Sequence, residues 1–514
     1  MKRMVMATIL AAGAFAAGVA DAQTARRAAI DKIDTVVVIY AENRSFDNLY
    51  GYFPGANGWN HVTAQRALQR DRDGSILREL PPIWTGLTAA GVTPPVTQAE
   101  TDHLPNHPFA IDDPKGFDQP LSVVTRDLWH LFYQNQMQID GGKNDKFAAF
   151  ADSGGLVMGY YKNDARNLPL WQIARRYEIA DNYFMGAFGG SFLNHQWLIC
   201  ACTPKYPNAD QSPAKTKIAA VNPDGVSLTL AADSPKSARD GVPKFVNNGT
   251  ITPDFYAVNT MQPPYQPSAV KPAPGGDPAL ADPADPSTLP PQTQQTIGDL
   301  LSAKGISWAW YSGAWQQALD SRDAAQRPIF FQYHHHPFNY FADMAPGTKA
   351  RAEHLRDGGL DGVQFIKAID DGNLPQVTFY KPQGNLNEHS GYASVLAGDK
   401  HIADVIAHLQ KSKQWPHMLI LVTYDENGGY WDHVAPPKGD RWGPGSRVPL
   451  IIVSPYARRG HVDHTQYDTT SILRFITRRF GLPTLPGLAA RNKALVAHGE
   501  KPMGDLTAAL DLRR

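Results

Sequence analysis

The sequence predicts an α/β fold with a mostly parallel central sheet and helices on both faces. Short apolar runs rich in β-branched residues recur along the chain, as buried parallel strands require. Helix-like patterns separate these runs, and no internal repeat is visible. The predicted strands cover 35–40, 306–311, 376–380, 418–424 and 448–453, and predicted helices include 168–177, 296–303 and 402–411.

The first 22 residues have the pattern of a secretory signal. Lys2 and Arg3 precede an apolar stretch over 7–20, and Ala20-Asp21-Ala22 fits the small-residue cleavage rule. The stretch is shorter than a spanning helix needs, although an N-terminal membrane anchor remains the alternative. We therefore expect residues 1–22 to be removed and the mature protein to be periplasmic or secreted.

Two long segments lack the periodicity of helices or strands. Residues 54–120 are rich in proline, glycine and polar residues, and residues 261–292 contain ten prolines. Such composition predicts irregular surface excursions inserted into a regular core. Residues 23–514 are therefore expected to form one domain with large irregular insertions, including a Pro-rich one at about 261–292.

Composition narrows the choice of partners. Removing Lys2, Arg3 and Asp21 from 49 basic and 49 acidic residues leaves 47 and 48. This balance argues against a nucleic-acid partner, and no later segment is long enough for stable membrane insertion. Cys200 and Cys202 are the only cysteines, on a strand-like segment. Two buried free thiols are expected there in preference to a strained disulfide.

Acidic pairs follow two of the predicted strands, almost four hundred residues apart. Glu42-Asn43 comes after the run at 35–40, and Asp425-Glu426 comes after the run at 418–424. Sites in open α/β sheets lie at the carboxyl ends of strands, so both pairs should meet at one edge. Three carboxylates and an amide oxygen would repel one another there unless a hard cation held them. The sequence therefore predicts a metal-dependent enzyme.

Ser191 is the candidate nucleophile. It follows Phe188-Gly189-Gly190 and precedes a helix-like run, so a tight turn would place it at a helix N-terminus. The helix dipole and free amides there favour an alkoxide and an anionic ligand. The simpler alternative is that Ser191 only caps this helix. The carboxylate pairs elsewhere in the chain favour the nucleophile.

Histidines are numerous near proline- and aromatic-rich segments. They are suited to contacting a substrate anion or protonating a leaving group, and protonation below about pH 6.5 would favour an acidic optimum. Each can equally be a hydrogen-bonded structural residue. The histidines in question are His103, His107, His334, His335, His336, His389 and His433.

Five motifs resemble those of the bacterial phosphoesterase family, which contains respiratory-burst-inhibiting acid phosphatases and phosphatidylcholine-type phospholipases C on an alkaline-phosphatase-like core. They fall in family order from residue 34 to about 460 and cover nearly the whole mature chain. The motifs are Ala41-Glu42-Asn43-Arg44-Ser45-Phe46-Asp47, Gly189-Gly190-Ser191 with Asn194-His195, Tyr333-His334-His335-His336-Pro337-Phe338, Glu388-His389-Ser390, and Tyr424-Asp425-Glu426-Asn427-Gly428-Gly429.

The resemblance implies residue roles. It implies one divalent metal ion, calcium, magnesium or manganese, because oxygen ligands suit these ions. The implied metal ligands are Glu42, Asn43, Asp425, Glu426 and, as both fifth ligand and nucleophile, Ser191. The implied catalytic and substrate-binding histidines are His107, His334, His335 and His389. His107 is preferred to His103 in a weakly patterned loop, and His336 is left out because the family often has another polar residue there.

The expected function is a secreted acid phosphatase that hydrolyses small phosphomonoesters through a phosphoserine. A phospholipase C that cleaves choline phosphodiesters is the alternative with the same residues. The phosphatase is preferred because the chain leaves no room for the C-terminal β-domains of longer phospholipases and lacks a twin-arginine signal. From a different class, a noncatalytic binding protein stabilised by calcium would explain the acidic cluster but not Ser191 and the histidines.

Overall fold

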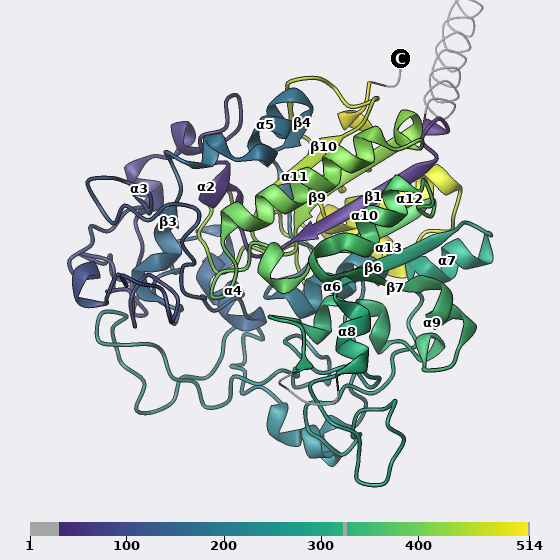
Figure 1. Ribbon diagram of the computed structural model, residues 1–514. Coiled ribbons are helices and arrows are strands. Elements are labelled where there is room, and N and C mark those ends of the chain that lie inside the picture. Colours follow the sequence, from purple (N-terminus) through teal and green to yellow (C-terminus); the bar gives the residue numbers. More distant parts are fainter. Residues whose placement is uncertain (1–29, 322–325, 512–514) are drawn as a thin grey trace, which may run out of the picture.

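An eight-stranded sheet forms the centre of the computed structural model, which describes residues 30–321 and 326–511. The predicted signal at 1–22 lies outside these residues. The strands of the sheet are β1 (Thr35–Ala41), β4 (Glu178–Ala180), β6 (Trp308–Gly313), β7 (Leu355–Gly359), β8 (Val377–Lys381), β9 (Met418–Tyr424), β10 (Leu450–Val453) and β11 (His461–Asp463). Their order is β11-β4-β10-β9-β1-β8-β6-β7 (Figure 1).

The sheet is mostly parallel. The β9, β1, β8, β6 and β7 strands run in one direction, whereas β10 is antiparallel to both of its neighbours. Every residue of β1 and β9 is buried, which is why these strands read as continuous apolar runs. Ala41 is paired with Tyr424, so the two strands end side by side.

Helices cover both faces of the sheet, so the predicted α/β class is confirmed. One layer contains α5, α10 and α11, and the opposite layer contains α6 and α12 (Figure 1). The helices are α2 (Phe46–Leu49), α3 (Ala64–Ala67), α4 (Phe132–Ile139), α5 (Pro169–Arg176), α6 (Ser191–Cys200), α7 (Ile297–Ala303), α8 (Trp315–Asp320), α9 (Lys349–His354), α10 (Val363–Asp370), α11 (Val395–Lys411), α12 (Thr469–Phe480) and α13 (Pro486–Ala497). No described helix is both long and apolar enough to cross a membrane.

All five predicted strands are present, but the prediction missed three short strands, two of which, β7 and β11, form the edges of the sheet. The missed strands β4, β7 and β11 are three to five residues long. Both β7 and β11 are only partly buried, so neither has the apolar run that identifies an inner strand. Two small ladders lie outside the main sheet, β2 (Phe109–Ala110) with β3 (Gly159–Tyr160) and β5 (Tyr183–Phe184) with β12 (Tyr467–Asp468).

The Pro-rich segment 261–292 contains no helix or strand and is held by isolated bridges, such as Gln262 with Thr288. It is fastened to the segment after the histidine triplet, because the Tyr340 hydroxyl donates to the Met261 carbonyl at 2.7 Å. Residues 54–120 form only short elements. Both segments are therefore irregular, as their composition indicates.

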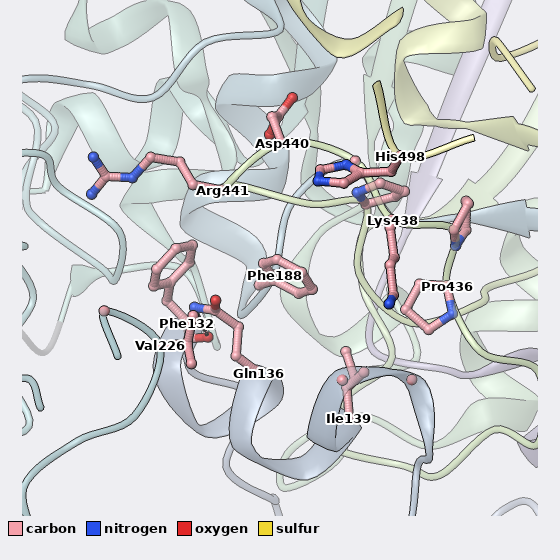
Figure 2. Close-up of a pocket in the computed structure, with 16 residues that line it drawn as sticks. Phe132, Gln136, Ile139, Phe188, Val226, Pro436, Lys438, Asp440, Arg441 and His498 are labelled. Atoms are coloured by element: carbon pink, nitrogen blue, oxygen red, sulfur yellow. Dashed lines mark hydrogen bonds between the residues drawn. The ribbon is translucent and has the colours of Figure 1, made fainter. Parts of the chain in front are cut away.

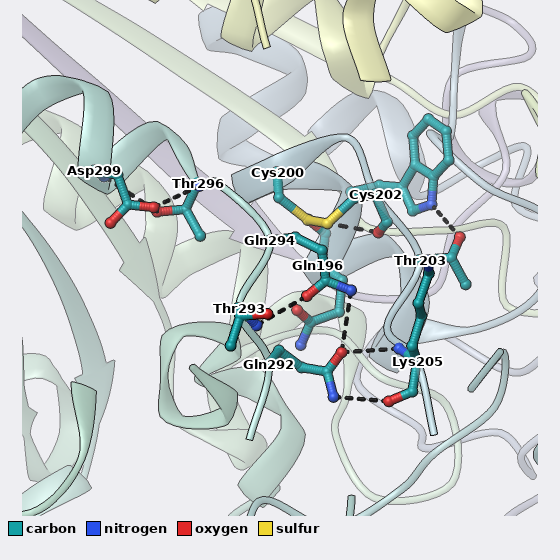
Figure 3. The surroundings of a disulfide bond; sticks show 11 residues. Gln196, Cys200, Cys202, Thr203, Lys205, Gln292, Thr293, Gln294, Thr296 and Asp299 are labelled. Carbon is teal, nitrogen blue, oxygen red and sulfur yellow. Dashed lines mark hydrogen bonds between the residues drawn. A yellow bond between two sulfur atoms is a disulfide. The ribbon is translucent and has the colours of Figure 1, made fainter. Parts of the chain in front are cut away.

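The cysteines differ from the expectation of two free thiols, because Cys200 and Cys202 form a disulfide (Figure 3). The segment is the end of α6 rather than a strand. Ala201 has a left-handed φ of 48°, which terminates the helix and brings the two Cα atoms to 5.1 Å. The disulfide therefore lies at the opposite end of the helix that begins with Ser191.

Candidate active site

The two acidic pairs meet at one edge of the sheet, where β1 and β9 end. Asp425 Oδ1 accepts hydrogen bonds from the backbone N–H groups of Asn43, at 3.1 Å, and Glu426, at 2.8 Å. Glu42, Asn43, Asp425 and Glu426 are all fully buried. The parallel register therefore brings together residues that are almost four hundred positions apart in the chain.

Three oxygen atoms in this cluster have no hydrogen-bond partner although they are buried. They are Asn43 Oδ1, Asp425 Oδ2 and Glu426 Oε1. Buried polar atoms are rarely left unpaired, because each such atom costs about 1–3 kcal/mol. Burial and the Asp425 carboxylate also hold the pKa of Glu426 well above its usual value. These oxygens therefore fit a hard divalent cation such as calcium, magnesium or manganese.

Backbone geometry at this edge is unusual in two residues that pack against each other. Asn43 has a φ of 60° and Gly428 a φ of 62°, both in the left-handed region. A Cβ added to Gly428 would lie 2.4 Å from the Asn43 carbonyl oxygen and 2.8 Å from its Cβ. A non-glycine side chain at Gly428 would therefore displace Asn43. Strain of this kind is concentrated at functional sites.

Ser191 lies against the same cluster. Its hydroxyl donates to Glu42 Oε2 at 3.1 Å, and it is the first residue of α6. Gly190 is the N-cap, so the alternative that Ser191 only caps the helix is wrong. Asn194 fixes the preceding turn through two bonds to the Ala187 backbone, at 2.9 and 3.1 Å.

A buried lysine, Lys381, was missed by the sequence analysis. It ends β8 next to β1, and its ammonium forms an ion pair with Glu42 Oε1. Burial and Asp425 raise the pKa of Glu42 to about 8, although Lys381 acts in the opposite direction. A lysine at the end of a mainly apolar predicted strand was the available signal, because lysine is almost never fully buried unless paired.

Ser191 opens into a cavity of about 350 Å³ that contains several of the predicted histidines. The residues that line it include Asp127, His130, Gly190, Ser191, Asn259, His334, His389 and Tyr392. His335 lies behind this lining, with Nε2 3.0 Å from Glu42 Oε1. His336 packs on Trp315, with ring centroids 4.3 Å apart, and stays out of the cavity.

The histidines beside Ser191 are held as neutral rings. Burial lowers the pKa of His334 to about 3, and burial together with Lys381 holds the pKa of His335 well below its usual value. The pKa of His389 is depressed by burial and by His130. Neutral rings donate hydrogen bonds to phosphoryl oxygens without adding positive charge. They do not support the expected acidic optimum, which required protonated histidines.

His195 is a further residue that the predicted site did not include. Its Nδ1 donates to the Ser191 carbonyl at 2.7 Å, and its ring stacks on His335 with centroids 5.0 Å apart. His195, His335 and Glu42 form one of the groups of described residues that could hold a metal ion. Another such group, Asp47, Asp432 and His433, already contains the Arg447 guanidinium as its counter-ion.

His107 does not lie at the site, and this corrects the sequence-based assignment. It is exposed, and its Nδ1 is bonded to the Pro108 carbonyl at 2.8 Å. His130 lines the cavity instead, with its ring centroid 5.5 Å from that of His389. His130 Nδ1 donates to the Leu128 carbonyl at 2.6 Å, which leaves Nε2 available. No pattern in the flanking residues marked His130, because its neighbours come from separate segments.

Alanine variants of the two histidines should separate these assignments. We expect His130→Ala to lower turnover of a phosphoester by about 10²-fold, the lower range for a lost acid–base group. We expect His107→Ala to leave turnover unchanged, because its ring faces solvent. Steady-state kinetics on both variants is the measurement. Equal losses in the two variants would restore His107 to the site.

Comparison with known proteins identifies a family and several relatives of the chain. A family model described as the Phosphoesterase family matches residues 33–483. Phospholipase C B of Mycobacterium tuberculosis is 23% identical over 511 residues, covering 93% of this chain and 77% of that protein. Hemolytic phospholipase C of Pseudomonas aeruginosa is 24% identical over 493 residues, covering 89% of this chain and 54% of that protein.

A solved structure also resembles the chain, although only loosely. It is that of a protein in the alkaline phosphatase superfamily from Vibrio parahaemolyticus, with a TM-score of 0.23 and 12% identity. The match covers 38% of this chain and 50% of that one. A structural likeness of this size does not bear on function.

Proposed function

Because the chain belongs to the phosphoesterase family, we propose that it is a phospholipase C that attacks phosphorus with Ser191. Hydrolysis of a phosphoric ester follows from the family. The assignment to Ser191 depends on one observation, the hydroxyl that donates to Glu42 at 3.1 Å beside three unpartnered buried oxygens.

The choice of a phosphodiester substrate departs from the phosphomonoester that the sequence favoured. Relatives that match across 93% of the chain are named phospholipases C. The neutral histidines also remove the reason for an acidic optimum. The alternative of the sequence analysis, cleavage of a choline phosphodiester, is therefore preferred to acid phosphatase activity.

The first chemical step transfers the phosphoryl group to the enzyme. A divalent ion bound by the carboxylate and amide oxygens would offset phosphoryl charge and lower the pKa of the Ser191 hydroxyl. Ser191 Oγ bonds to phosphorus as the bond from phosphorus to the glycerol oxygen breaks. Glu42 Oε2 already accepts a hydrogen bond from the Ser191 hydroxyl, and it takes the hydroxyl proton in this step. The N-terminus of α6 and the neutral His334 donate to the phosphoryl oxygens. His389, whose Nδ1 already donates to the Ser390 carbonyl, lines the cavity beside them.

Protonation of the departing oxygen is assigned to His130. It is a partly exposed ring of the cavity and its Nδ1 donates to the Leu128 carbonyl, so in the imidazolium form its Nε2 proton is available for the departing oxygen. Water then attacks phosphorus and gives a proton back to His130, while the bond from phosphorus to Ser191 Oγ breaks and Glu42 returns its proton to the serine. The products are a diacylglycerol and a phosphomonoester such as phosphocholine.

Export from the cytoplasm and a single catalytic domain over residues 23–514 are parts of the same proposal. The Cys200–Cys202 disulfide supports export, since disulfides persist in oxidising compartments. One hydrophobic core that extends from Ile30 to Leu510 supports the single domain.

Substrate choice is tested by comparing p-nitrophenyl phosphorylcholine with p-nitrophenyl phosphate from pH 4 to 9, with and without chelator. We expect the diester to be preferred by at least about ten-fold in kcat/KM, which corresponds to a 1.4 kcal/mol difference in transition-state binding. We expect chelator to abolish turnover and added divalent metal to restore it. Preference for the monoester, with a maximum at acidic pH, would instead establish an acid phosphatase.

A further inference from the structure

A second cavity has a volume of about 330 Å³, and Figure 2 shows the residues that line it. Some of them are adjacent in sequence to residues that line the Ser191 cavity. Its walls are mainly apolar and come from the start of α4, the turn before α6, and the segment around Pro436. Phe132, Ile139 and Phe188 form much of this lining, and Val226 lies at its edge. No step of the proposed reaction uses these residues.

The two cavities share one thin wall. His130 and Leu131 face the Ser191 cavity, whereas the next residue, Phe132, faces the apolar one. The turn before α6 also contributes to both cavities, because Phe188 lines the apolar cavity and Gly190 lines the Ser191 cavity. A Cβ added to Gly189 would lie 2.6 Å from the Phe132 nitrogen, so the two segments are in direct contact. The two cavities are therefore neighbours on either side of this wall, and a chain attached to a phosphoryl group at Ser191 would have to pass over its rim to enter the apolar cavity.

Asp440 and Arg441, two of the charged residues around the apolar cavity, are already paired and do not mark a site for a polar ligand. Asp440 accepts from Arg491 Nε at 2.7 Å, and Arg441 pairs with Asp254 at 2.6 Å. Lys438 reaches past Pro436 beside the cavity (Figure 2), where its ammonium would attract the phosphate or ester oxygens of an amphiphile. Apolar walls with a cation at the margin suit a ligand with an apolar chain and an anionic group.

The margin of the cavity also exposes apolar surface to solvent. Val226 is 47% exposed and lies in an irregular hairpin that is closed by the Val221–Leu228 and Leu230–Phe245 bridges. Phe245 contacts Trp129, with ring centroids 6.1 Å apart, and Trp129 precedes His130. The hairpin therefore connects the margin of the apolar cavity with the wall of the catalytic one.

We propose that the apolar cavity holds one acyl chain of a glycerophospholipid whose phosphoryl group is at Ser191. This inference rests on the proposed phospholipase C function and names the part of the substrate that the cavity recognises. The chain would enter past Val226 and pack on Phe132 and Phe188, while the Lys438 ammonium faces the ester region. Burial of each methylene adds to binding, so longer chains should be preferred until the cavity is full.

The test uses the full-length protein and two variants that alter the cavity without altering the catalytic residues. Val226→Asp places a charge at the entrance, and Gln136→Trp fills the cavity from α4. Val246→Asp is the matched control, because Val246 is 62% exposed in the same hairpin and lines neither cavity. The substrates are p-nitrophenyl phosphorylcholine, which has no acyl chain, and phosphatidylcholines with dibutyryl to dioctanoyl chains below their micelle concentrations.

We expect kcat/KM of the wild-type protein to rise with chain length. Both cavity variants should lose about ten-fold with dioctanoyl phosphatidylcholine. Turnover of p-nitrophenyl phosphorylcholine should stay within about two-fold of wild type in all three variants. Calorimetric titration with decanoate provides a readout that needs no turnover, and binding should weaken in the cavity variants alone.

Other results would overturn the proposal in distinguishable ways. No dependence on chain length, with p-nitrophenyl phosphorylcholine still hydrolysed, would reject the acyl site but leave the enzyme a phosphodiesterase. Hydrolysis of p-nitrophenyl phosphate alone would reject the phospholipase assignment, and decanoate titration would then decide the cavity separately. Dimerisation that Val226→Asp abolishes, without decanoate binding, would assign the cavity to a second copy of the chain.

Discussion

Ser191→Ala is expected to lower turnover at least about 10³-fold while the protein remains folded. The substitution removes the atom proposed to bond to phosphorus, and among the described residues no other hydroxyl is hydrogen-bonded to Glu42. The lost Ser191–Glu42 hydrogen bond is one contact among many in a buried site, so stability should change little. Steady-state kinetics and thermal melting are the two measurements, and an acid-quenched wild-type reaction with a choline phosphodiester should contain phosphorylcholine esterified to Ser191.

Another serine at the start of a helix provides the control. Ser394 caps α11 by accepting from the Ala397 backbone N–H at 3.2 Å. Ser394→Ala should cost about 1 kcal/mol of stability, as a lost N-cap does, and leave turnover intact. The two substitutions are therefore expected to have opposite effects. Wild-type turnover in a folded Ser191→Ala protein would remove Ser191 from the mechanism.

Asp425→Asn is expected to abolish metal binding and lower turnover at least about 10²-fold. The asparagine oxygen can still accept the two backbone hydrogen bonds that Asp425 Oδ1 accepts. The change is therefore confined to Oδ2, the unpartnered atom, which becomes an amide nitrogen that cannot ligate a cation. Calorimetric titration with calcium, magnesium and manganese, after treatment with chelator, measures the loss directly.

A second buried aspartate serves as the control for Asp425. Asp112 accepts backbone N–H groups from Lys162, Asn163 and Asp164 and lies outside the acidic cluster. Asp112→Asn should change stability alone, with metal affinity and turnover preserved. If Asp425→Asn binds metal as well as the wild-type protein does, the metal site would instead be the group of Glu42, His195 and His335, which combines a carboxylate with ring nitrogens.

The inner sheet could be predicted from the sequence because its strands are buried on both faces. Strands β1 and β9 appear as unbroken apolar runs, and the rule that sites form at strand carboxyl ends then placed Glu42 and Asp425 together. Their exact register is set by side-chain packing between distant segments. The edge strands β7 and β11 lack an apolar run because solvent contacts them, and the inner strand β4, with three residues, is too short to show periodicity.

The missed site residues share a physical reason. Lys381, His130 and His195 act through contacts between segments far apart in the chain, and their neighbours in sequence do not show which side chain faces Glu42. His107 was chosen from a loop in which exposure is not encoded by periodicity. The disulfide was missed because it depends on the left-handed turn at Ala201, which the sequence did not indicate.

The position of Lys381 has a consequence for the valence of the ion that the site accepts. Three buried carboxylates, Glu42, Asp425 and Glu426, carry three negative charges when ionised, and the Lys381 ammonium offsets one of them. Two negative charges remain at the edge of the sheet. A monovalent cation would leave the buried site negative, and a trivalent cation would leave it positive. With all three carboxylates ionised, charge balance would therefore favour a divalent ion over a monovalent or trivalent one.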